Sequence, residues 1–205
     1  MKKIIKFLAG LALAGMVLPA SAQIDLSLSP ASQTVGLGGD ATYNVIISGL
    51  KGSADYNGPV VGGFDIVLDY NPAIASVQSV SFTSLLNVDA GGDFPSSDLG
   101  ATTPGQLVLE DISGGSVAAL EAAQGKSFTL ASFTLQGINL GVTALTFDPT
   151  TSLSDENAYT LDLINATGGS LSVIPEPGLY GGLAGVAACG VCVLRRKSQT
   201  ADRKA

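Results

Sequence analysis

Carboxylates are the main side chains in this sequence that could do chemistry. The chain has 17 Asp and Glu residues and no histidine. Without an imidazole there is no general base for a Ser–His or Cys–His nucleophile system, and no histidine ligand for a metal. The sequence therefore predicts no catalytic residue of these kinds, and we expect a protein that is not an enzyme.

Two pairs of neighbouring acids are the candidates for glycoside hydrolysis, which needs two carboxylates flanking one bond. Glu110 and Asp111 lie in a stretch with strand periodicity, where neighbouring side chains point to opposite faces. Asp155 and Glu156 lie in a predicted loop. We interpret all four as ordinary surface acids.

A glycine-rich loop carries three more carboxylates, those of Asp89, Asp93 and Asp98. Oxygen ligands in a flexible loop suit Ca²⁺, but this spacing does not follow the order of an EF-hand. The sequence favours a solvated loop and no cofactor. Calcium held by these three residues is the alternative.

Exposed aromatic side chains are the usual platforms for sugars, and the chain has no tryptophan. Tyr43 and Tyr70 fall on the apolar side of predicted strands. Tyr56 falls in a predicted turn, and Tyr56 and Tyr159 are the aromatic residues expected to be exposed and hence the candidate ligand contacts. Carbohydrate binding is therefore an alternative function with few residues to support it.

Charge is distributed unevenly along the chain. Residues 23–173 hold two lysines, no arginine and fifteen acids, a net charge of −13. Such a body repels phosphate backbones, so we expect no nucleic-acid partner.

The first 22 residues have the three parts of a secretory signal peptide. Three lysines precede an apolar run, and Ala20-Ser21-Ala22 provides small residues for cleavage. We predict that signal peptidase cuts between Ala22 and Gln23, and that the chain is exported.

The last segment, residues 174–205, also has three parts. Pro175-Glu176-Pro177 precedes the uncharged stretch Gly178–Leu194, and Arg195 and Arg196 follow it. The stretch is just long enough for a membrane helix, and the basic end should stay in the cytoplasm. Its two cysteines, at positions 189 and 192, are interpreted as small packing residues of that helix.

This tail resembles the PEP-CTERM sorting signal of Gram-negative bacteria. The resemblance implies recognition by an exosortase, transient anchoring in the inner membrane with the body in the periplasm, and a final place at the cell surface or outside the cell. Such proteins are typically exported alongside extracellular polysaccharide. A plain membrane anchor, kept rather than cleaved, is the alternative.

Residues 23–173 read as an all-β domain. Short alternating apolar runs are separated by Gly, Pro, Asn and Asp, which indicates about nine strands in a two-sheet sandwich or jelly roll. The apolar parity changes between Phe128 and Phe133, which predicts a β-bulge near Ala131–Ser132. Only residues 116–124 have helical spacing, and Gly125 would end that helix.

The segment Gly63–Pro72, with the sequence GFDIVLDYNP, resembles the cohesin pattern of a Gly-Phe strand that runs through Leu and Tyr into an Asp-Pro turn. Asn71 takes the place of the usual Asp. Residues 128–135, 153–157 and 169–173 resemble later strands and the closing loop of the same family. The resemblance implies a nine-strand jelly roll and, because cohesins bind dockerins in cellulosomes, a dockerin-like partner.

Together these features predict an exported, non-enzymatic protein of the cell surface or extracellular matrix with a cohesin-like binding or structural domain. The alternative is an accessory module that binds extracellular polysaccharide.

Overall fold

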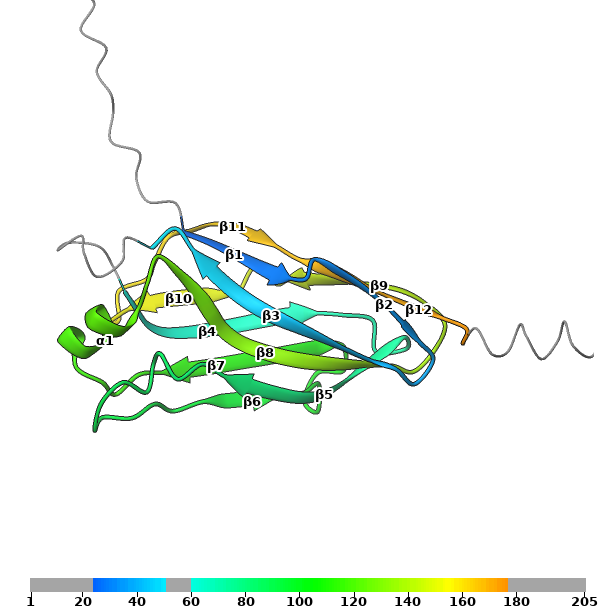
Figure 1. The fold of residues 1–205 in the computed structure, drawn as a ribbon, viewed down its shortest axis with the longest axis horizontal. Helices are drawn as coiled ribbons and strands as arrows, with labels where there is room; N and C mark the ends of the chain where they lie inside the picture. The colour runs from blue at the N-terminus through cyan, green and yellow to red at the C-terminus, as the bar shows by residue number, and fades with distance from the viewer. Residues whose placement is uncertain (1–23, 51–59, 177–205) are drawn as a thin grey trace, which may run out of the picture.

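Two β-sheets packed face to face form the body of the protein (Figure 1). The computed structural model describes residues 24–50 and 60–176. The smaller sheet has five strands in the order β11-β1-β3-β8-β5. These are β1 (Ile24–Ser29), β3 (Asp40–Ser48), β5 (Ala75–Phe82), β8 (Ser127–Gly137) and β11 (Leu163–Thr167).

The larger sheet has seven strands, six of them in the order β2-β12-β9-β4-β7-β6, with β10 also paired to β4. These are β2 (Ser32–Gly36), β4 (Val61–Asp69), β6 (Ser96–Asp98), β7 (Gln106–Ile112), β9 (Gly141–Phe147), β10 (Ser152–Asp155) and β12 (Gly169–Ile174). The predicted sandwich is confirmed, although the described residues form twelve strands rather than nine. The difference comes from strands of three to five residues, which are too short to show an alternating pattern.

Strand β4 shows how alternation builds the core. Phe64, Ile66 and Leu68 are buried between the sheets, whereas Asp65 and Asp69 point away from the core and are partly exposed. This assignment of faces is as predicted. Tyr43 is also fully buried, as expected, and its hydroxyl donates a hydrogen bond to the Ser170 carbonyl across the sandwich (2.7 Å).

The predicted bulge lies in β8, one residue earlier than expected. Val45 of β3 pairs with Ala131 and the next residue, Ile46, pairs with Thr129, so Leu130 is the extra residue. Leu130 and Ala131 are both buried in succession. The bulge lets the apolar residues before and after it face the same core.

The predicted helix is α1 (Val117–Ala123), which ends at Gln124. The Gln124 side chain is buried and pairs with the backbone of Val61 at the start of β4. Its Oε1 accepts from the Val61 N–H, and its Nε2 donates to the Val61 carbonyl, both at 2.7 Å. The Gln124 side chain thus makes the two hydrogen bonds with Val61 that the backbone of a neighbouring strand would otherwise make.

The first two strands of the domain pair with its last two strands. β1 pairs with β11 and β2 pairs with β12, both in parallel, so that the chain enters one sheet and crosses to the other at residues 30–31. β12 ends at Ile174, one residue beyond the predicted domain boundary.

Candidate binding site

The outer face of the larger sheet carries apolar side chains that are exposed at its two ends and partly buried between them, and we call this set the apolar strip. Val67 of β4 lies directly opposite Val108 of β7. Ile112 of β7 is 62% exposed and Val142 of β9 is 64% exposed. We call this surface, with Asp65, Asp69, Glu110 and Ala144, the β4–β7–β9 face.

Carboxylates lie between the members of the apolar strip and interrupt it. Asp65 and Glu110 are directly opposite each other in the β4–β7 pair, and Asp69 follows along β4. Like charges in facing positions destabilise a sheet. A partner that brings cationic side chains to this face would relieve that repulsion while it covers the valines.

The outer face of the smaller sheet differs in chemistry. Hydroxyl and amide side chains form rows across neighbouring strands, with register pairs Ser29–Asn44–Ser132–Ser81 and Thr42–Thr134–Ser79. The Thr42 and Thr134 hydroxyls lie 2.9 Å apart, and the Ser132 hydroxyl donates to the Asn44 amide oxygen (2.6 Å). We call this surface the hydroxyl face.

The calcium candidates are not brought together as a set. Asp89 accepts hydrogen bonds from the backbone N–H groups of Ser116 and Gly91, and these bonds lower its pKa. Hydrogen bonds from Thr102 and from the Ala101 backbone lower the pKa of Asp98 in the same way. Both carboxylates therefore stabilise turns, and the described residues contain no cluster of three or more Asp, Glu, His or Cys that could hold a metal.

The prediction that Asp111 is a surface acid is wrong. Its exposed fraction is 0%, and neither carboxyl oxygen accepts a hydrogen bond of good geometry, although the backbone N–H groups of Ile112 and Phe94 act to lower its pKa. Burial and the nearby negative charge of Asp93 raise the pKa of Asp111 to about 6. The signal was present in the sequence, because Asp111 has the same parity as the buried Leu107 and Leu109. Glu110 is exposed on the opposite face, as predicted.

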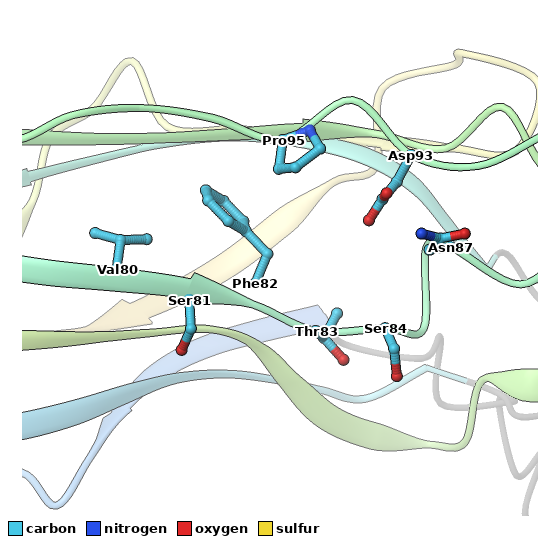
Figure 2. Close-up of a pocket in the computed structure, with 8 residues that line it drawn as sticks. All are labelled: Val80, Ser81, Phe82, Thr83, Ser84, Asn87, Asp93 and Pro95. Atoms are coloured by element: carbon cyan, nitrogen blue, oxygen red, sulfur yellow. The ribbon is translucent and has the colours of Figure 1, made fainter.

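A pocket of about 630 Å³ opens between the end of β5 and the loop that precedes β6 (Figure 2). Phe82 and Pro95 line its apolar part, and Asp93 and Asn87 lie together at one end. The close approach of Gly91 to Gly114 fixes this loop, since a Cβ on Gly91 would lie 1.8 Å from the Gly114 carbonyl oxygen.

The second acidic pair also serves a turn. Asp155 accepts hydrogen bonds from the backbone N–H groups of Asn157 (2.9 Å) and Tyr159 (2.8 Å). Tyr159 is 72% exposed, as predicted, and its role as a ligand contact stays a prediction. Tyr56 lies outside the described residues.

The sorting and processing residues are described only in part. Pro175 and Glu176 follow β12, and Glu176 is exposed. Ala22, Gln23, Pro177, Arg195 and Arg196 lie outside the described residues, as do the predicted signal peptide and apolar tail. Among the helices in residues 24–50 and 60–176, none has the length and apolarity to cross a membrane.

Comparison with solved structures identifies the architecture. The cohesin CaCohA2 of Clostridium acetobutylicum, crystallised in complex with a dockerin, superposes with a TM-score of 0.57 over 74% of this chain and 100% of that chain, at 21% sequence identity. The fold is that of a cohesin domain. No protein-family model matches the sequence, and no curated protein sequence matches it.

Other cohesins are similar to the same extent. A cohesin from Clostridium thermocellum, crystallised with its dockerin, has a TM-score of 0.57 at 11% identity, covering 75% of this chain and 94% of that one. A type II cohesin from the cellulosome of Acetivibrio cellulolyticus has a TM-score of 0.52 at 16% identity, covering 74% and 95%. The cohesin-like fold thus extends over the described body, and two of these neighbours are crystallised in complex with dockerins.

Proposed function

We propose that this protein is an exported binding module whose cohesin-like domain captures a dockerin-like partner on the β4–β7–β9 face. The observation that supports this most is the presence of exposed apolar side chains on that face, with carboxylates between them, in a fold whose neighbours are crystallised with dockerins. The partner we infer presents an apolar ridge flanked by Lys or Arg.

Binding to purified dockerins tests this proposal. The full chain, purified in a non-ionic detergent, is titrated calorimetrically with the dockerins of the C. acetobutylicum and C. thermocellum complexes. We expect at least one dissociation constant of about 10 µM or lower. Ile112→Glu and Val142→Glu should each weaken binding at least about tenfold, because each places a charge in the apolar strip.

Ser79→Glu is the matched control, because it adds the same charge to the exposed hydroxyl face. It should leave the dissociation constant unchanged. Absence of binding at about 100 µM dockerin, or equal loss in all three variants, would contradict the proposal.

We further propose that the chain is exported by its signal peptide and sorted by an exosortase through the PEP-CTERM-like tail. Two prolines around Glu176 keep the backbone extended ahead of the apolar stretch, and Glu176 is the only charge there. A membrane enzyme could recognise such a segment, whereas a plain anchor needs only length and flanking charge.

Replacing Pro175-Glu176-Pro177 with three alanines separates these two possibilities. We expect the variant to accumulate unprocessed in the cytoplasmic membrane while the wild type loses its tail and reaches the surface or medium. Mass spectrometry of the mature C-terminus is the measurement. An intact Lys204-Ala205 end on the exported wild-type protein would overturn exosortase processing.

Polysaccharide binding is the second candidate function. The hydroxyl face offers rows of neutral donors and acceptors, and Tyr159 offers an exposed ring. Glycan-array binding that is lost in Tyr159→Ala but kept in Ile112→Glu would favour this function over dockerin capture.

A further inference from the structure

The four turns at one end of the sandwich contain no charged residue. They join β2 to β3 (residues 37–39), β4 to β5 (70–74), β6 to β7 (99–105) and β8 to β9 (138–140). Figure 1 shows that β12 ends at the same tip of the domain, beside the β2–β3 and β8–β9 turns. We call these four turns, together with Ile174 at the end of β12, the C-terminal tip.

The C-terminal tip exposes apolar side chains. Those between 40% and 53% exposed are Leu37, Ile138, Leu140 and Ile174. Backbone hydrogen bonds hold the segments that carry them together. The Leu37 N–H donates to the Ile174 carbonyl (3.1 Å), and the Gly38 N–H donates to the carbonyl of the last residue of β8 (2.7 Å). A group of exposed apolar side chains of this kind marks a surface that meets a protein or a membrane.

The loops at the opposite end of the sandwich have a different composition. Residues 83–95, 113–126 and 156–162 carry five acids and one lysine, namely Asp89, Asp93, Glu121, Glu156, Asp162 and Lys126. Charged side chains are costly to move out of water, and acids are repelled by anionic headgroups. The C-terminal tip is therefore the end of the domain whose turns lipid can cover without removing a charge from water.

The sequence that follows the tip indicates which partner meets it. Gly178–Leu194 contains no charge, and only residues 175–177 separate it from Ile174. A chain spans at most about 3.6 Å per residue, so Ile174 lies within about 14 Å of the uncharged stretch. A bilayer that takes up this stretch is thereby held next to the tip at a high effective concentration.

We propose that the C-terminal tip rests in the interface of the lipid bilayer, with its four exposed apolar side chains among the headgroups. The inference rests on insertion of the tail, which exosortase sorting and a plain anchor share. The acidic end of the domain then points away from the membrane, and the β4–β7–β9 face stays open to a partner. The same contact keeps Pro175-Glu176-Pro177 at the lipid surface, within reach of a membrane enzyme.

A fluorescent probe at the tip tests this contact. The full chain, with Cys189→Ala and Cys192→Ala, is reconstituted in phosphatidylcholine vesicles and labelled with the environment-sensitive dye NBD at Leu140→Cys. Ile112→Cys is the matched control, an exposed apolar position at the opposite end. We expect the tip probe to lie about 5–10 Å within the interface and to lose about half of its emission or more to headgroup nitroxide lipids. The control probe should keep the emission it has in water.

Charged substitutions show whether the apolar side chains hold the tip at the lipid. Leu37→Glu with Ile138→Glu should return the tip probe to water, because each change places a carboxylate at the contact. Both positions are exposed without lipid, so this variant should unfold at the wild-type temperature. Ile112→Glu with Val117→Glu adds the same charge at the opposite end and should leave the tip signal unchanged. Equal quenching in both variants would mean that the tether alone brings the tip near the lipid, and would contradict the proposal.

Insertion of the tail is measured separately, so that the two proposals can fail separately. A chain that keeps only Cys192 is labelled there and read against acyl-chain nitroxides. A quenched tail probe with a tip probe that matches the Ile112 control would overturn the tip contact and leave sorting intact. A tail probe in water would refute the anchoring on which both proposals rest. A blue-shifted tip probe that nitroxide lipids do not quench would show contact with protein and also exclude the lipid contact.

Discussion

Single side chains on β4 differ in their contribution to stability according to the face they occupy. Phe64 and Leu68 are buried, so truncating either to Ala should cost about 2–5 kcal/mol of unfolding free energy. Asp65→Ala and Asp69→Ala should cost well under about 1 kcal/mol, since both point away from the core. Chemical denaturation of the four variants measures this, and equal losses at all four positions would contradict the assignment of faces.

Turn carboxylates make a contribution that depends on pH. Hydrogen bonds from Thr102 and Ala101 lower the pKa of Asp98 below that of the unfolded chain. The stabilisation is therefore present above the unfolded pKa of about 4 and disappears as the pH falls through the lower, folded-state pKa.

Asp98→Asn should accordingly lower the Tm at pH 7 and have no effect at about pH 2. Thermal melts of the wild type and the variant across this range give the difference. A Tm difference that is constant with pH would show that the charge of Asp98 is not what stabilises the turn.

The sequence was most informative where a residue follows the regular pattern of its strand. Alternation identified the buried side of β4 and the core position of Tyr43 correctly. It also assigned Glu110 and Asp111 to opposite faces of the strand correctly. We had interpreted both side chains as solvent-exposed, and for Asp111 this was wrong. The enclosure of Asp111 depends on the loop around Asp93, which folds over the end of β7 through contacts distant in sequence.

At the scale of elements, the junction between α1 and β4 depends on one residue that sequence analysis did not single out. Gln124 makes two buried hydrogen bonds with Val61, one as acceptor and one as donor. A residue at the end of a short helix gives no periodic signal for such a role. The pairing partner becomes evident only when the start of β4 is placed beside it.

Gln124→Leu leaves the N–H and carbonyl of Val61 without partners and should cost about 1–3 kcal/mol for each unsatisfied group. Gln124→Glu should also be destabilising, because an ionised carboxylate accepts from the N–H but cannot donate to the carbonyl. Urea denaturation measures both. A Gln124→Glu variant as stable as the wild type at pH 8 would contradict this account.

The sequence predicted individual strands and not their pairing. The nine-to-eleven-residue strands β3, β4 and β8 have clear alternation, and the phase change in β8 revealed its bulge to within one residue. β5 has no regular alternation and was not identified. The parallel pairs β1–β11 and β2–β12 were not anticipated. These pairs form because the chain crosses from one sheet to the other, and such a crossing cannot be predicted from a local sequence pattern.

At the scale of the whole molecule, the body should fold without either end. The core joins both sheets, and residues 23–173 contain no cysteine, so no disulfide is required. We extend the fragment to residue 176 to keep all of β12, which ends at Ile174. Residues 23–176 should give a soluble monomer with a β-type circular dichroism spectrum and one cooperative unfolding transition.

Size-exclusion chromatography and circular dichroism melts of this fragment are the measurements. The same fragment ended at residue 168, which lacks β12, is the control and should not fold, because β12 joins β2 to β9 in the larger sheet. A folded control, or an unfolded 23–176 fragment, would contradict the domain boundaries.

The interior position of β12 has a mechanical consequence for a chain held by its C-terminal tail. The tether would leave from the end of a strand that is hydrogen-bonded on both sides, to β2 in parallel and to β9 in antiparallel. A load along that strand must shear both ladders at once, whereas a load along an edge strand shears only one. The domain is therefore attached at a point where it resists traction from a bound partner.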